Sequence, residues 1–212
     1  MTYLRRIADA LLDALYPADC ACFMCGKEAP LDKGGMCAHC STDIKPGGAW
    51  KVDGLDEVCA AFKYEGAARE CIRRFKYENA KHIAARLAQH ISIPAYWGID
   101  VVVPVPLHTK RLRERGYNQS ALLAERIAAA NGLLFAPKLL ERIRNTTSQV
   151  GLGGQERAKN IAGAFRANEG CDGKCVLLVD DVLTTGATMR ECANALRLRG
   201  AKKVYGAVAA RD

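Results

Sequence analysis

Short apolar runs alternate with segments of helical periodicity over most of the chain. The runs at 57–64, 100–107 and 176–179 are strand-sized, and the last is apolar at every position, as in strands buried on both faces of a parallel sheet. Helical periodicity is found in four segments, 67–75, 81–91, 121–130 and 189–199. The pattern therefore predicts an α/β body with a parallel sheet flanked by helices.

Residues 1–16 are predicted to form an N-terminal helix. Ile7, Leu11 and Leu15 recur at helical spacing, so one apolar stripe would lie on the body or on a partner. A signal peptide is not expected, because Asp9 and Asp13 interrupt any apolar core. Since the longest apolar runs are strand-sized, no membrane span is expected, and a cytoplasmic location is predicted.

Two cysteine pairs predict a metal site in residues 17–48. Cys22 and Cys25 form one Cys-x2-Cys pair, Cys37 and Cys40 form the other, and eleven residues separate the pairs. Four thiolates suit tetrahedral Zn2+ and leave no coordination position open, so the metal is expected to be structural. A segment this short, with so little apolar core, would hardly fold without a bound metal. Lys45 to Gly48 would be a turn or linker closing this zinc module.

The other cysteines are not expected to bind the metal. Cys20 and His39 lie beside the two pairs but do not have the spacing of ligands. Cys171 and Cys175 give a weak metal signal, and with the remaining cysteines they are better explained as small buried residues, because the surrounding sequence is apolar or helical.

The positive charge is concentrated in one part of the sequence. The chain has a net charge of +8. Residues 1–50 hold 5 basic and 6 acidic residues, which sum to −1, whereas residues 101–166 hold 11 basic and 4 acidic residues, which sum to +7. Such a region can attract a polyanion such as DNA or hold the pyrophosphate of a small ligand, and charge alone does not decide between them.

The segment 176–188 places acidic residues next to a hydroxyl-rich turn. Asp180 and Asp181 follow the apolar run, and the carboxyl ends of central strands are where open α/β sheets bind ligands. Thr184, Thr185, Gly186, Ala187 and Thr188 then precede a predicted helix, whose N-terminus favours phosphate. A ribose 5-phosphate would satisfy both groups, since its hydroxyls need acceptors and its phosphate needs donors. The alternative is an ordinary strand-to-helix turn with acidic caps.

A second candidate anion site follows the run at 100–107. Its proline-containing end is followed by Lys110, Arg111, Arg113 and Arg115 and then by a glycine, which provides the donors and the close backbone approach that a pyrophosphate needs. The alternative is a solvated basic helix face. Lys63 and Lys76, each in a Phe-Lys-Tyr tripeptide, are more readily explained as solvated side chains than as ligand contacts.

These motifs resemble known families. The order strand, Asp-Asp, x-x, Thr-Thr-Gly-x-Thr resembles the motif that binds 5-phosphoribosyl 1-pyrophosphate (PRPP) in type I phosphoribosyltransferases. Pro-Val-Pro-Leu-His at 104–108 and Arg-Gly-Tyr-Asn-Gln-Ser at 115–120 resemble the ComF family, which joins a four-cysteine zinc module to a type I phosphoribosyltransferase fold. The resemblance extends from about Pro17 to Ala210 and implies a phosphoribosyltransferase-like domain over residues 49–212.

The resemblance also implies roles for individual residues. Asp180 and Asp181 would bind the ribose hydroxyls and, through water, Mg2+. Residues 184–188 would bind the 5-phosphate, while Lys110, Arg111 and Arg115 are candidates for the pyrophosphate. Residues 144–160 would form a flexible hood over the ligand, as their glycine-rich composition also indicates.

Three functions remain open at this point. The protein could be a PRPP-dependent transferase in nucleotide or base metabolism, but no motif identifies the phosphoribosyl acceptor. It could be a ComF-like competence protein that assists uptake or processing of transforming DNA, with single-stranded DNA and a competence helicase or another DNA-uptake protein as possible partners. It could also be a non-catalytic nucleic-acid-binding protein, although the intact acidic pair and threonine turn weigh against this third function.

Overall fold

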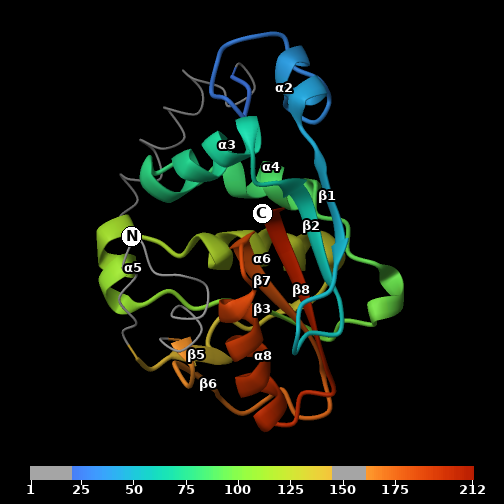
Figure 1. Ribbon diagram of the computed structural model, residues 1–212, viewed down its shortest axis with the longest axis vertical. Coiled ribbons are helices and arrows are strands. Elements are labelled where there is room, and N and C mark those ends of the chain that lie inside the picture. Colours follow the sequence, from blue (N-terminus) through green and yellow to red (C-terminus); the bar gives the residue numbers. More distant parts are fainter. Residues whose placement is uncertain (1–20, 145–160) are drawn as a thin grey trace.

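The computed structural model describes residues 21–144 and 161–212, so the predicted N-terminal helix and most of the predicted hood lie outside the described residues. A six-stranded sheet in the order β1-β2-β8-β7-β3-β4 forms the centre of the fold (Figure 1). Its strands are β1 (Pro46–Trp50), β2 (Val58–Lys63), β3 (Val101–Pro104), β4 (Leu134–Phe135), β7 (Cys175–Leu183) and β8 (Lys203–Arg211). All neighbours are parallel except β1 and β2, which confirms the predicted α/β class.

Helices cover both faces of the sheet. The helices of the described segments are α3 (Gly66–Tyr77), α4 (Ile83–Gln89), α5 (Thr109–Arg115), α6 (Gln119–Asn131) and α8 (Ala187–Leu198), together with the short α2 (Ala38–Asp43) and the 3-10 turn η1 (Ala95–Trp97). Helices α3, α4 and α6 bury their apolar residues in one cluster with Leu177 and Val179 of β7, whereas α8 packs in a second cluster with Val176 and Leu178. The alternation along β7 is the two-residue period of a strand with two buried faces.

The chain connections across the sheet run in opposite directions on the two sides of the β3–β7 pair. From β3 the chain continues through α6 to β4, on one side, whereas β7 continues through α8 to β8, on the other side and over the opposite face. In open α/β sheets such a switch point leaves a crevice at the carboxyl ends of the two strands, and ligands bind there.

The cysteine-rich segment is not separated from the body by a linker. The predicted turn at Lys45 to Gly48 is wrong, because residues 46–50 form β1 and pair with β2. Gly47 permits this pairing, since a Cβ at that position would lie 2.6 Å from the Ala60 carbonyl oxygen. The Nε of Arg211 also donates to the Gly47 carbonyl oxygen at 2.6 Å.

Apolar residues of the cysteine-rich segment belong to the main core. Phe23, Met24 and Met36 are buried in the same cluster as α3, α4 and α6. Figure 1 shows this segment and α2 at one end of the molecule, next to α3. Nη1 of Arg74 in α3 donates to the carbonyl oxygens of Phe23 and Met24 at 3.2 and 3.4 Å. Folding of the segment is thus coupled to the packing of α3.

A small antiparallel sheet of β5 (Leu140–Arg142) and β6 (Phe165–Ala167) completes the fold beside α8. Within residues 21–144 and 161–212, no helix is both long and apolar enough to cross a membrane.

Candidate functional site

The acidic pair lies on β7, at the switch point between β3 and β7. The predicted strand was expected to end at Val179, but β7 continues to Leu183 because β8 pairs with it as far as Arg211. On the other side β3 ends at Pro104, opposite Val179. Asp180 and Asp181 therefore lie just past the end of β3.

Asp180 is held by donors from two elements. Its Oδ1 accepts a hydrogen bond from Oγ of Ser120, in the first turn of α6, at 2.7 Å, and another from the Asp181 backbone N–H at 2.8 Å. Burial, and then the charge of Asp181, raise the pKa of Asp180 from 3.8 to about 7, although both hydrogen bonds oppose the change. The group can therefore gain or lose a proton near neutral pH.

Asp181 forms a salt bridge with Lys76 of α3. The lysine Nζ lies 2.8 Å from Oδ1 of Asp181, and the two side chains are only 18% and 11% exposed. Burial disfavours the lysine charge, but the carboxylates of Asp181 and Asp180 outweigh it and raise the pKa of Lys76. The prediction of a solvated Lys76 is thus wrong, whereas Lys63, in the matching tripeptide, is exposed.

The threonine turn connects β7 to α8. Thr184 and Thr185 are exposed, while Gly186 adopts a φ of 74° and serves as the N-cap of α8. Glycine is needed there for two reasons. Other residues rarely adopt this positive φ, and a Cβ at this position would lie 2.7 Å from Cγ1 of Val52. The turn thus presents hydroxyl groups at the positive end of a helix, beside the acidic pair.

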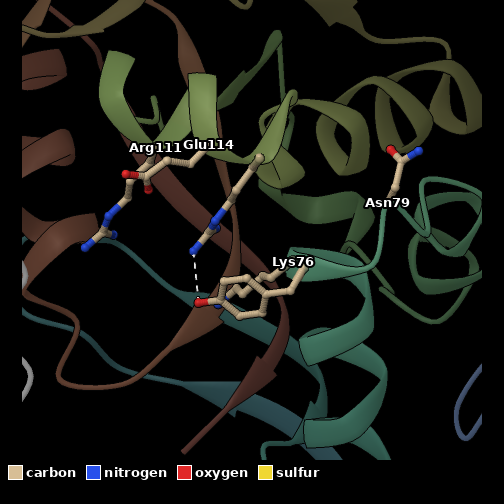
Figure 2. A pocket seen from close by; sticks show the side chains of 6 residues that line it. Lys76, Asn79, Arg111 and Glu114 are labelled. Atoms are coloured by element: carbon tan, nitrogen blue, oxygen red, sulfur yellow. Dashed lines mark hydrogen bonds between the residues drawn. The ribbon is translucent and has the colours of Figure 1, made fainter.

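A basic cleft of about 750 Å3 lies next to the acidic pair. It is lined by Lys76, Tyr77, Asn79, Arg111, Glu114 and Arg115 (Figure 2). Two of the three predicted pyrophosphate residues, Arg111 and Arg115, therefore face one cavity, whereas Lys110 is exposed and is not among the lining residues. Nη2 of Arg115 donates to the Tyr77 hydroxyl at 3.3 Å, and Nη1 donates to Oε1 of Gln119 at 3.1 Å.

Sequence reasoning missed the contribution of α3 to this cleft. Lys76, Tyr77 and Asn79 come from a segment about 100 residues before the acidic pair, and no motif links the two. The repeated Phe-Lys-Tyr tripeptide was the available signal, but it marks Lys63 and Lys76 equally.

The four predicted zinc ligands lie together at the end of the molecule near α3. The Sγ atoms of Cys22, Cys25, Cys37 and Cys40 are all within 4.8 Å of one another. Burial opposes ionisation, but backbone N–H groups of Cys25, Cys37 and Met24 lower the pKa of Cys22 to about 7. Burial and the neighbouring thiols raise the pKa of Cys40. Such a cluster needs a cation before all four thiols can ionise, which fits Zn2+.

The other cysteines of the described segments are dispersed. Cys59, Cys71, Cys171 and Cys192 are buried and Cys175 is half-buried, and among described residues the four-thiol group is the sole candidate metal cluster. This agrees with their interpretation as small residues of the interior.

Comparisons with known proteins identify the domain that holds the acidic pair. Residues 115–212 match the model of the "Phosphoribosyl transferase domain" family. The match includes the acidic pair, the threonine turn and Ser120, but neither Lys76 nor the four cysteines. Together with the mostly parallel sheet, it confirms the predicted phosphoribosyltransferase-like α/β fold.

Similarity to curated proteins extends over most of the chain. Competence protein F of Haemophilus influenzae is 27% identical, with 86% of this chain and 81% of the relative covered. DNA utilization protein YhgH of Salmonella typhi is also 27% identical (86% and 93% covered), and competence protein ComFC of Bacillus subtilis is 29% identical (84% and 72% covered). In this chain a cysteine cluster precedes a phosphoribosyltransferase domain, as the sequence motifs indicated, and together with these relatives this confirms its resemblance to the ComF family.

Proposed function

We propose that this protein binds PRPP together with Mg2+ and acts in natural competence, in the uptake or processing of transforming DNA. The observation that carries the proposal is the position of Asp180 and Asp181: they lie at the sheet's switch point and are followed directly by the threonine turn and the N-terminus of α8. Acceptors for ribose hydroxyls and donors for a phosphate are thereby offered side by side.

Each part of PRPP would have its own group of residues. The carboxylates of Asp180 and Asp181 would accept hydrogen bonds from the ribose hydroxyls, and residues 184–188 would donate to the 5-phosphate. The cleft with Arg111 and Arg115 would take the pyrophosphate, because fixed guanidinium groups suit phosphate oxygens. Lys110, which is exposed outside the cleft, would contribute at most from its edge.

The residues present also fit the two metal ions. Carboxylate oxygens are ligands that Mg2+ prefers, so the acidic pair could hold the ion through water while PRPP supplies further oxygens, and the ion would neutralise pyrophosphate charge. The four thiols would hold Zn2+, which would fix the fold of the N-terminal segment and supply no chemistry at the ligand site.

The competence role is supported by the names of the relatives, competence protein F and ComFC. Complementation would test it. The wild-type gene should restore transformation frequency in an H. influenzae strain that lacks its competence protein F, whereas a variant that cannot bind PRPP should not. Equal rescue by both would separate the competence role from the ligand site.

Calorimetric titration tests the ligand itself. Wild-type protein should bind PRPP in the presence of Mg2+, and the double variant Asp180→Asn, Asp181→Asn should lose that binding. A matched control, Asp53→Asn with Glu169→Gln, removes two carboxylates at exposed positions and should bind as the wild type does. Absence of binding to wild-type protein would refute the proposal.

A further inference from the structure

We propose that Lys76 contacts the pyrophosphate group of PRPP while it remains anchored on Asp181, and so joins the ribose site to the basic cleft. This inference rests on the proposed function and adds to it a ligand-binding residue from α3, outside the segment that matches the phosphoribosyltransferase domain.

The same ammonium group belongs to both parts of the site. Its Nζ lies 2.8 Å from Oδ1 of Asp181, and its side chain lines the cleft with Arg111 and Arg115. Figure 2 shows Lys76 on α3 and Arg111 on α5, on different walls of that cleft. An ammonium group carries three N–H donors, so the salt bridge to one carboxylate oxygen leaves donors for a second anion.

The backbone that carries Lys76 is fixed by the segment leading into α6. The Tyr117 hydroxyl donates to the Phe75 carbonyl oxygen, and Nε2 of Gln119 donates to the Lys76 carbonyl oxygen at 3.5 Å. These are carbonyls of the last turn of α3, which have no partner within the helix. Because Ser120, the next residue, donates to Asp180, one short segment positions both the acidic pair and the lysine.

Charge and burial make Lys76 suited to this contact. The side chain is only 18% exposed, so its ammonium group has lost much of its hydration, and it would bind an anion more strongly than an exposed lysine does. In PRPP the pyrophosphate is attached to the ribose at C1. A ribose held by the carboxylates therefore places the pyrophosphate next to the group that already touches one of them. A cation there would also stabilise the charge that develops if pyrophosphate leaves.

Two ligands that differ only in the pyrophosphate test the contact. Lys76→Met should weaken PRPP binding with Mg2+ by about tenfold or more, as expected for loss of a charge-assisted hydrogen bond. Binding of ribose 5-phosphate, which lacks the pyrophosphate, should change much less. The control is Lys63→Met, which removes an exposed lysine from the same tripeptide and should leave both affinities unchanged.

The remaining outcomes overturn the inference. If Lys76→Met weakens the binding of both ligands equally, Lys76 only positions Asp181. If the variant binds both ligands more tightly, Lys76 only competes with them for the carboxylate of Asp181. No change in either affinity would leave it without a role. If wild-type protein binds neither ligand, the proposed function is refuted and the inference about Lys76 is overturned with it, whereas the outcomes above refute the inference alone.

A second pair of variants guards against misfolding, because Lys76→Met leaves a buried carboxylate without its partner. Asp181→Asn and the double variant Asp181→Asn, Lys76→Met both lack that charge. The double variant should lose a further factor of about ten for PRPP relative to ribose 5-phosphate. An unchanged ratio between the two ligands would refute the contact.

Discussion

Replacing Asp180 with asparagine should stabilise the free protein above neutral pH. The pKa of this carboxyl is raised from 3.8 to about 7 by burial and by the charge of Asp181. The folded protein therefore holds the proton more tightly than the unfolded chain does, and stability is lost as the pH rises from about 4 to about 7. Asparagine has no proton to lose and retains an oxygen that can accept from Ser120 and from the backbone N–H of residue 181.

The magnitude follows from the two pKa values. The cost of the ionised carboxylate, relative to its protonated form, is at most about 4 kcal/mol once the pH exceeds 7, at roughly 1.4 kcal/mol for each pKa unit. About two-fifths of this free-energy cost is already present at pH 5, because the carboxyl of the unfolded chain is largely ionised at that pH. Partial solvent access to the carboxyl reduces the rest of the cost. The stability of Asp180→Asn relative to the wild type should therefore increase by roughly 1–3 kcal/mol between pH 5 and pH 8.

Urea unfolding of zinc-saturated protein at a series of pH values would measure this change. Asp53→Asn is the control, since it removes one carboxylate from an exposed turn and reports the effect of net charge alone. An advantage of Asp180→Asn that stays constant or shrinks from pH 5 to pH 8 would refute the argument. The stabilised variant should nevertheless bind PRPP and Mg2+ poorly, because the ionised carboxylate is the form that a cation selects.

Three further predictions concern the zinc cluster and the support of the acidic pair. Cys37→Ser should lose bound zinc and lower the melting temperature of the whole protein, because Phe23 of the same segment lies in the main core. An unchanged melting temperature of the body, with a separate transition for the N-terminal segment, would contradict this. Arg74→Met should speed the transfer of zinc to a chelator, since it removes the hydrogen bonds from α3 to the cysteine-rich segment, and an unchanged rate would show that these bonds do not hold it. Ser120→Ala should raise the pKa of Asp180 further, measured by carbon NMR of the carboxyl, because the serine hydroxyl favours the ionised form; a lowered pKa would refute this role.

Much of the site was predicted from the sequence because its parts are local. The apolar run before Asp180, the acidic pair and the threonine turn lie within 13 consecutive residues, from 176 to 188, and one strand-turn-helix unit places them together whatever the rest of the chain does. The same holds for the cysteine pairs, where each Cys-x2-Cys turn brings its two thiols together. These patterns determined the α/β class, the candidate zinc ligands and the candidate ribose and phosphate residues.

The tertiary structure decided which distant residues join that unit. Lys63 and Lys76 have the same neighbours in sequence, but Lys63 ends a strand at the surface, whereas Lys76 lies in the last turn of α3, against the start of α6 and beside Asp181. Pro46 to Trp50 likewise has the composition of a turn, but it forms a strand because the edge of β2 is available to pair with it. A local pattern fixes the backbone of its own residues, whereas salt bridges and strand pairing depend on contacts between segments that only the folded chain brings together.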